Sequence, residues 1–450
     1  MTRFLERVGV PAALQRCLPD GRTSPNQIPV VDMALALMAS VLTGGRRFAH
    51  VERLRSDEVV RAILGIERMP SAMTLTRYFG GFVRSQVECL GQVLSRFVVE
   101  RLRCPMLGMV LDLDSTVVER FGTQEGSLKG HNPRRHGRPS HHPLLAMLAE
   151  AKVVLNAWLR SGNAGSARGV CAFLAETLAL LPETFRLYAV RADSGFFIAE
   201  FLDFLEAREL PYAIVVRMTL HVRRELVRLQ GWRPFGEGLS VAEFAYQAPT
   251  WKKARRVVVV REELRERPAA KGRRLLDVPG YTFHAVVTSL PHRPEDVWRF
   301  YNDRADCENR IKELKDDFGA DGFCLQSFDG TEAVFRLNCF LFNLLADFKR
   351  NVTADEKPRL ATLRSNLLVV GAILGADGRE PVLRLGLRGR WRHAFQQLLD
   401  RIDGVPAATV AQPANPEGPP ALARLRLWRL RPRRARHTPA WLRPGWLLTN

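Results

Sequence analysis

Four polar side chains of different chemistry recur at helical spacing near residue 300. They are Tyr301, Arg304, Glu308 and Lys315, at offsets of zero, three, seven and fourteen residues. At about 100° per residue of an α-helix, all four fall within an arc of about 60°. A carboxylate beside a phenol and two cations suits a metal ligand that must also meet phosphate groups. Glu313 would lie about 140° further round the helix, so the spacing selects Glu308 over Glu313.

The alternative for this segment is an ordinary solvated helix. Arg304–Glu308 and Glu308–Lys312 would then be i, i+4 ion pairs of the kind that stabilise any exposed helix. The segment alone does not decide between the two readings, so the rest of the chain must be considered.

Two strand-like segments contribute further carboxylates. Asp112 and Asp114 lie in the run L-D-L-D-S-T, where strand alternation puts both on one face. A charged pair on an apolar strand lowers stability unless it binds something. Asp193 follows the strand-like run F-R-L-Y-A-V-R-A, and strand ends are where α/β sheets carry their chemistry. A lone aspartate at a strand end is also a common turn cap.

Two strand aspartates and one helix glutamate could together hold divalent cations. A pair of such ions roughly 3.5–4 Å apart activates a water or a 3′-hydroxyl and stabilises the leaving oxygen in phosphoryl transfer. Oxygen ligands with open positions favour Mg²⁺ or Mn²⁺. Strand parity leaves open whether Asp112 or Asp114 belongs to this set.

The charge balance of the whole chain indicates an extended polyanion as partner. Lys and Arg number 67 against 47 Asp and Glu, a formal net charge of +20 over 450 residues. A membrane surface is the competing explanation. However, the longest apolar stretch, residues 367–376, is far shorter than the roughly 20 residues of a membrane-spanning helix. Charges also interrupt the N-terminal residues, which is not the pattern of a signal peptide.

The cysteines predict reduced thiols. There are seven, an odd number, and none form a C-x-x-C pair. Both facts argue against a disulfide framework and against a structural zinc site. We therefore expect a protein of a bacterial-type cytoplasm.

The patterning of the N-terminal part predicts helices. A buried helix is expected over residues 28–42, ended by Gly44-Gly45, and another begins after a Ser71 cap. Short helices, a tight turn and Arg77 resemble a helix-turn-helix arrangement, with a plain helical subdomain as the alternative. From residue 106 strand and helix patterns alternate, which predicts a mixed α/β fold.

The patterning divides the chain into six segments. These are a helical N-terminal DNA-binding region (1–105), the first part of an α/β core (106–217), a β-rich insertion (218–294), the second part of the core with the Glu308 helix (295–350), a helical C-terminal region (351–404) and a basic Pro/Arg-rich tail (405–450), expected to be disordered when free.

Taken together, these residues resemble the DDE transposases of bacterial insertion sequences. The closer resemblance is to the branch with a β-strand insertion between the second aspartate and the glutamate. That branch carries a Y-x-x-R-x-x-x-E-x-x-x-x-x-x-K signature, which the four residues near position 300 match at every defined position. The blocks F-G-T-Q-E-G-S-L-K-G-H-N-P and G-R-P-S-H-H-P-L also look like this branch.

The resemblance implies a ribonuclease-H-like catalytic core interrupted by the β-rich insertion. It also implies metal-dependent nicking at the element ends and strand transfer into target DNA, commonly through a hairpin. The family's first aspartate precedes a hydroxyl residue on the first strand, which fits Asp114. The resemblance thus makes Asp114, Asp193 and Glu308 the catalytic residues and the ligands of two Mg²⁺ or Mn²⁺ ions.

The resemblance also implies how double-stranded DNA is bound. The family's signature residues contact transposon-end phosphates, which carries over to Tyr301, Arg304 and Lys315. A homodimer that bridges two element ends and a cytoplasmic, nucleoid-associated location follow from the same source. Further contacts are expected in the block 121–143, from Lys129, Arg134, Arg135, Arg138, His141 and His142.

Two of these expectations have explicit alternatives. His141 and His142 could belong to a metal site, but the sequence offers no third partner at a suitable spacing. Trp251, which precedes K-K-A-R-R, could stack on a flipped base near a hairpin tip. The alternative for Trp251 is a hydrophobic plug in a small β-domain.

Three functions compete on the sequence alone. An active transposase is favoured. A catalytically inactive DNA-binding relic or a repressor of transposition would be indicated by the loss of a carboxylate, and all three are present. A different ribonuclease-H-like enzyme, such as a nuclease or resolvase, is disfavoured by the basic N-terminal region, the β insertion and the Tyr/Arg/Lys stripe.

Overall fold

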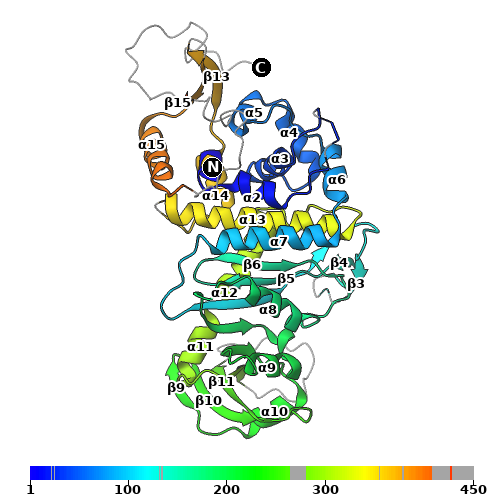
Figure 1. Ribbon diagram of the computed structural model, residues 1–450. Helices are drawn as coiled ribbons and strands as arrows, with labels where there is room; N and C mark the ends of the chain where they lie inside the picture. Colours follow the sequence, from blue (N-terminus) through cyan, green and yellow to red (C-terminus); the bar gives the residue numbers. More distant parts are fainter. Residues whose placement is uncertain are drawn as a thin grey trace, which may run out of the picture.

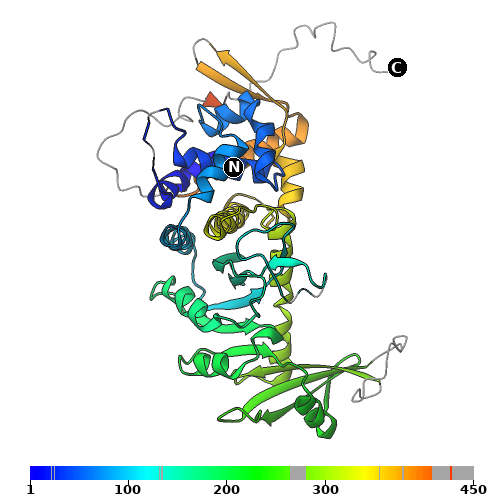
Figure 2. The ribbon, with the colours of Figure 1, turned by 90° about the vertical axis from the view of Figure 1, so that its right-hand side faces the viewer.

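The computed structural model is elongated, and its main sheet runs from the middle to the lower end in Figure 1 (see also Figure 2). In Figure 1 the N-terminal helices lie above this sheet, and the strands of the predicted insertion lie at the lower end. The structure describes residues 1–21, 23–24, 26–130, 132, 135–263, 280–353, 355–377, 380–407 and 426–427.

A mixed sheet runs through the described residues in the order β6-β5-β1-β7-β8-β12-β11-β10-β9. β1, β7 and β8 run parallel to one another, and β5 and β6 form an antiparallel hairpin beside β1. The mixed α/β fold that the sequence predicted is confirmed. The bounds of these five strands are β1 (Met109–Ser115), β5 (Leu144–Leu148), β6 (Val153–Trp158), β7 (Leu187–Ala192) and β8 (Tyr212–Val215).

The sequence of β1 explains its central place in the sheet. Leu111 and Leu113 are fully buried and join the main apolar core. Because side chains alternate along a strand, Asp112 and Asp114 lie on the opposite face. One face of β1 therefore builds the core, and the other carries the acidic groups.

The strands of residues 218–294 extend this sheet and do not form a separate one. β12 pairs antiparallel with β8, and β11, β10 and β9 follow outward. The segment also contains a helix, α10, which the β-rich prediction missed; Thr219 caps it, and Val222 and Leu226 bury one face. The bounds are β9 (Arg233–Gly236), β10 (Leu239–Tyr246), β11 (Arg255–Glu263), β12 (Tyr281–Thr288) and α10 (Leu220–Arg228).

The N-terminal hundred residues are helical, as the patterning indicates. Ser71 caps α6 by accepting a hydrogen bond from the Thr74 N–H (3.1 Å). The DNA-binding role of this region stays a prediction. The helices are α1 (Thr2–Arg7), α2 (Val10–Cys17), α3 (Val30–Leu42), α4 (Glu52–Arg55), α5 (Glu58–Leu64), α6 (Ala72–Gly80) and α7 (Arg84–Val99), with a 3₁₀ turn at Phe48–Val51.

Further helices connect and cover the strands. α13 is nearly all buried, and it packs against α7 on one side and against β6 on another, as both ribbon views show (Figure 1, Figure 2). Among the described residues, no helix is both long and apolar enough to cross a membrane. The bounds are α8 (Val170–Ala179), α9 (Ala199–Glu206), α11 (Pro294–Asn302), α12 (Ala305–Asp316) and α13 (Phe328–Val352).

The C-terminal region is only partly helical. α14 (Leu360–Leu363) and α15 (Gly389–Gly404) flank a hairpin of β13 (Ala372–Asp377) and β14 (Glu380–Leu385). The prediction of helix throughout 351–404 is therefore wrong over this hairpin. Its two runs flank Asp377-Gly378, a dipeptide typical of short hairpin turns.

The basic tail predicted over residues 405–450 lies largely outside the described residues. Its described parts are 405–407 and β15 (Arg426–Leu427), which pairs parallel with β14.

The crossing of α7 and α13 predicts that Gly91 cannot accept a side chain. A Cβ there would lie 2.0 Å from Nη1 of Arg336, which is buried and ion-paired with Glu332 (2.8 Å). Gly91→Ala should lower the free energy of unfolding by about 1–3 kcal/mol, despite the better helix propensity of alanine. Urea unfolding followed by circular dichroism measures this. Gly80→Ala is the control, because a Cβ at Gly80 meets nothing within 4 Å; a stabilised Gly91→Ala would contradict the close contact.

Candidate active site

Three acidic side chains meet near the carboxyl ends of β1 and β7. Asp114 is the last residue but one of β1, and Asp193 directly follows β7. Because the two strands are parallel neighbours, both aspartates emerge at the same edge of the sheet. Glu308 comes to this edge from the first turn of α12, and the charges of Asp193 and Glu308 both act on Asp114.

The ionisation of Asp114 reflects this crowding. Burial raises the pKa of Asp114 to about 6. The positive charge of Arg304 opposes the shift, and the like charges of Asp193 and Glu308 add to it. A cation placed beside Asp114 would therefore stabilise its charged form.

Arg304 is the central cation of the site. Its Nη2 lies 3.1 Å from Oδ2 of Asp114 and donates to the Leu113 carbonyl (3.1 Å), and its Nη1 lies 3.2 Å from Oε1 of Glu308. The side chain is 3% exposed. Burial alone would lower the pKa of Arg304, but Asp114 and other nearby acidic groups raise it above its usual value. The Arg304–Glu308 ion pair expected for a solvated helix is thus present, but the Arg304 side chain is buried against β1.

The stripe of four residues lies on two helices and not on one. Tyr301 belongs to α11, whereas Glu308 and Lys315 belong to α12. The predicted single helix is therefore wrong at the junction, although Asp303 and Arg304 keep helical backbone angles. Tyr301 still joins the site: burial raises its pKa to about 12, with Asp193, Glu308 and Asp114 adding to the shift.

A side chain from β7 accounts for this break. In a continuous helix the Phe300 carbonyl would accept the Arg304 N–H. Here the Phe300 carbonyl accepts Nη1 of Arg191 (2.6 Å), and the Arg304 N–H bonds to the Tyr301 carbonyl (3.0 Å). The hydrogen-bond donor at the end of α11 is thus the side chain of Arg191 on β7.

Lys315 ties the far end of α12 to the loop after β1. Its Nζ donates to the Thr116 hydroxyl (3.3 Å) and to the Val117 carbonyl (3.0 Å). The phosphate contact expected of Lys315 stays a prediction, and these internal bonds hold its ammonium group against the residues that follow β1.

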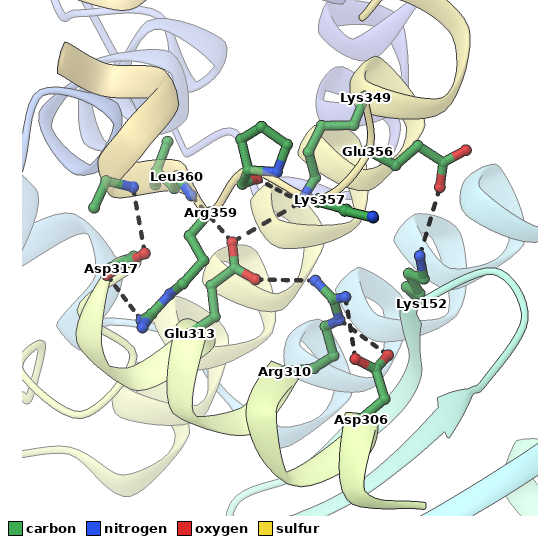
Figure 3. A network of polar contacts seen from close by, with 12 residues as sticks. Lys152, Asp306, Arg310, Glu313, Asp317, Lys349, Glu356, Lys357, Arg359 and Leu360 are labelled. Atoms are coloured by element: carbon green, nitrogen blue, oxygen red, sulfur yellow. Dashed lines mark hydrogen bonds and ion pairs between the residues drawn. The ribbon is translucent and has the colours of Figure 1, made fainter. Parts of the chain in front are cut away.

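The two glutamates of α12 have different surroundings, as their spacing predicts. The Glu308 side chain is 68% exposed, whereas that of Glu313 is 2% exposed. Glu313 accepts the Leu360 N–H (3.1 Å) and lies 3.3 Å from Arg310 and 3.9 Å from Lys349 (Figure 3). Glu313 thus anchors α12 to α13 and to the segment after it.

The two aspartates of β1 also differ. Asp112 accepts two hydrogen bonds from Arg191, at 2.6 and 2.9 Å, and is 2% exposed. Asp114 is the one that meets Arg304 and feels the charges of Asp193 and Glu308. Strand parity left open whether Asp112 or Asp114 belongs to the acidic cluster, and the geometry supports Asp114.

Asp193 acts as a turn cap as well as a neighbour of the acidic cluster. Its Oδ1 accepts the Gly195 N–H (2.8 Å) and caps the short turn Ser194–Phe196. Ser166, which the sequence analysis missed, packs so close that a Cβ on Gly195 would lie 2.6 Å from its Cβ. The Ser115 hydroxyl donates to the Ser166 hydroxyl (3.0 Å). The small-residue run S-G-N-A-G-S-A after β6 was the available signal for this close loop.

The exposed residues expected to contact DNA lie on a small sheet beside the site. Lys129 is exposed on β3 (Leu128–Lys129), which pairs with β4 (Pro139–His141). Arg138 is exposed, with its guanidinium 5.2 Å from the ring of Phe121, itself 76% exposed. β2 (Val118–Glu119) completes this sheet, where Arg135 pairs with Glu119 at 3.4 Å. Arg134 lies outside the described residues.

The paired histidines are structural and not at the surface. His141 accepts a hydrogen bond from Arg120 at Nδ1 (2.9 Å) and contacts the Glu125 carbonyl through Nε2 (2.9 Å). His142 is also buried and bonds to the Ala164 carbonyl through Nδ1. The expectation that these two rings contact DNA is wrong, because both are enclosed by the chain.

Trp251 is likewise packed. It is 7% exposed, with Phe197 and Tyr246 against its ring at 5.3 and 5.5 Å and the Arg255 guanidinium 4.7 Å away. The structure therefore contradicts base stacking by Trp251 as it lies here and agrees with the hydrophobic plug.

Comparison with known proteins identifies the family. The sequence profile described as transposase DDE domain group 1 matches residues 1–407. The chain belongs to the DDE transposase family. No curated protein matches its sequence. Among solved structures, it is similar to a piggyBac transposase in a cryo-electron microscopy structure of a synaptic complex with hairpin DNA, with a TM-score of 0.45 and 11% identity over 91% of this chain and 80% of that chain.

Membership of the DDE transposase family implies an enzyme that cleaves and transfers DNA, generally with divalent metals. Asp114, Asp193 and Glu308 fit such ions in chemistry, because they offer oxygen donors only. In the part of the chain that the structure describes, no group of three or more His, Cys, Asp or Glu side chains is arranged to hold an ion. Arg304 pairs with both Asp114 and Glu308. For an ion to bind here, the carboxylates would therefore have to move closer to one another.

The buried His141 predicts acid sensitivity of this DDE transposase. Burial lowers the pKa of His141 from 6.5 to about 4, so between these values the unfolded chain binds a proton that the folded chain does not. Stability should therefore fall as the pH drops below about 6.5, by about 2 kcal/mol at pH 5 from this group.

Urea unfolding at pH 7 and pH 5 measures the acid sensitivity. His141→Gln is the control variant, because a glutamine can keep both hydrogen bonds but does not titrate. The drop between the two pH values should be smaller in His141→Gln than in the wild type. Equal drops in both proteins would show that His141 contributes nothing to it.

Proposed function

We propose that this chain is the active transposase of a bacterial insertion sequence. It binds the terminal inverted repeats, cleaves the element ends and joins them to target DNA by two-metal phosphoryl transfer, in a cut-and-paste route through a hairpin. The observation that carries the proposal is the meeting of Asp114, Asp193 and Glu308, from β1, β7 and α12, around one buried arginine.

The fold supports a ribonuclease-H-like core. The hairpin β5-β6 beside the parallel strands β1, β7 and β8, with α12 bringing Glu308 to the strand ends, is the order of elements that the proposal needs. The strands β9 to β12 then form the insertion between Asp193 and Glu308.

The three carboxylates would hold two Mg²⁺ or Mn²⁺ ions. When bound, such ions activate a water or a 3′-hydroxyl and stabilise the leaving oxygen. The residues of the chain orient the reacting groups: Arg304 neutralises Asp114, and Tyr301 places its phenol against the same cluster. The Ser166 hydroxyl, which accepts a hydrogen bond from the Ser115 hydroxyl, would use its own proton to donate to a scissile phosphate.

DNA binding is proposed along the same edge of the molecule. Tyr301 and Lys315 would meet transposon-end phosphates close to the cleavage point, and exposed Lys129 and Arg138 would contact the duplex further out. The phosphate contact predicted for Arg304 does not fit its place in the structure, where its side chain is 3% exposed and paired with Asp114 and Glu308. The net charge of +20 supports a long, salt-sensitive contact. We also propose that the protein forms a homodimer that bridges two element ends. It would act in the cytoplasm, at the nucleoid.

The proposal predicts that the carboxylates are needed for cutting but not for binding. Asp193→Asn and Glu308→Gln should each lower the cleavage rate by about a thousandfold or more, because each removes a ligand of the reacting centre. The assay uses labelled DNA from the ends that flank this reading frame, with Mg²⁺ and with EDTA. Both variants should still bind these ends.

The matched control is Asp316→Asn, an exposed carboxylate on the same helix that pairs with Arg359 at 3.8 Å. It should cut like the wild type. Tight end binding by the wild type without cutting in any metal would instead establish an inactive DNA-binding relic.

A further inference from the structure

A buried ion pair lies directly behind the acidic cluster. Arg191 and Asp112 are opposite each other in the parallel pairing of β7 and β1. They form a two-pronged contact, Nε to Oδ1 at 2.6 Å and Nη2 to Oδ2 at 2.9 Å, with side chains only 3% and 2% exposed. The remaining nitrogen, Nη1, donates to the Phe300 carbonyl (2.6 Å). One guanidinium thus joins two strands and the end of α11.

The positions of these groups relate simply to the proposed catalytic residues. Asp112 lies two residues before Asp114 on β1, and Arg191 lies two residues before Asp193. Two residues of a strand span about 6.6 Å and return to the same face. Phe300 immediately precedes Tyr301 in the signature segment. Arg191 therefore joins β1 and β7 two residues before their catalytic aspartates, and it bonds to α11 one residue before Tyr301; α12, which carries Glu308, follows α11 directly.

Apolar packing does not account for this arrangement. A cleft of about 280 Å³ borders the pair and is lined by Asp112, Arg191, Phe300, Cys307 and neighbouring residues. The centre of the Phe300 ring lies 5.0 Å from the guanidinium, whereas the three hydrogen bonds of the guanidinium are 2.6 to 2.9 Å long. These bonds fix the spacing of the three elements where the packing leaves space.

The energetics of a buried pair point the same way. Removing two charges from water costs several kcal/mol per ion, and well-packed apolar residues of similar volume often give equal or greater stability. Stability alone therefore poorly explains a buried arginine that also donates a hydrogen bond to a carbonyl at the end of a helix. Its bonding is specific, because Nη1 of Arg191 donates to the Phe300 carbonyl, to which the Arg304 N–H would bond in a continuous helix, and the Arg304 side chain itself pairs with Asp114.

We propose that Asp112 and Arg191 are positioning residues, which hold Asp114, Asp193 and the Tyr301–Glu308 segment in register for metal loading and strand cleavage. This inference rests on the proposed function. It assigns the pair no contact with substrate or metal.

The test is a double variant, Asp112→Leu with Arg191→Met, which replaces the pair by apolar side chains of similar size. It should unfold in urea at a concentration close to that of the wild type. Its Mn²⁺ affinity, measured by calorimetry on the chain bound to its end DNA in a cleavage-resistant form, should fall about 10- to 100-fold. In single-turnover cleavage the rate constant should fall by a similar factor, with end-DNA affinity unchanged.

The matched control is another buried ion pair, which includes none of the proposed catalytic residues: Glu332→Leu with Arg336→Met on α13. It should leave Mn²⁺ affinity and cleavage at wild-type values. If the Asp112/Arg191 double variant also behaves like the wild type, the positioning role is overturned.

A second variant covers the case in which the double variant fails to fold. Arg191→Lys keeps the charge but loses the two-pronged contact and the Phe300 bond, and it should lower Mn²⁺ affinity and the cleavage rate in the same direction. Unchanged values in Arg191→Lys would overturn the inference. If the wild type itself binds no Mn²⁺ and does not cut, the proposed function fails, and the positioning role fails with it.

Discussion

The repulsion between the buried carboxylate of Asp114 and two acidic groups near it is the constraint on which the site depends. Asp114 is buried beside two other acidic groups, and such an arrangement persists only with a cation in reach. Arg304 supplies the cation from the junction of α11 and α12, and its bond to the Leu113 carbonyl fixes that charge to β1. The place of α12 beside the sheet follows, because a guanidinium meets several acceptors in fixed directions.

The sequence of α12 explains why polar contacts hold it. Its run A-D-C-E-N-R-I-K-E-L-K-D offers few apolar residues to a core, chiefly Cys307, Ile311 and Leu314. The remaining support comes from charged groups near its C-terminal end. Glu313 fastens the helix to α13 and the segment after it (Figure 3). Lys315 fastens it to the loop after β1. Glu308 can therefore stay exposed on a helix that is itself firmly held.

The sequence was most informative where one element decides the geometry. Helical spacing separated Glu308 from Glu313, and strand patterning found β1 and located the end of β7. It failed where a distant residue decides: the break before Arg304 depends on Arg191, more than a hundred residues earlier in the chain. The same holds for Trp251, whose neighbours Phe197 and Tyr246 could not be read from its own basic surroundings. It also holds for His141, which bonds to Arg120 and to the Glu125 carbonyl.

The pairing of β12 with β8 has a consequence for how this protein can be divided. An insertion that forms its own domain can be cut out at its two connections, and the host closes over the gap. Here residues 218–294 supply the hydrogen-bonding neighbour of β8, itself next to the strand that leads to Asp193. Excision would expose a bare strand edge, the kind of surface that recruits other chains into aggregates. The segment is an insertion in the order of the chain, but in the architecture it is an integral part of the sheet.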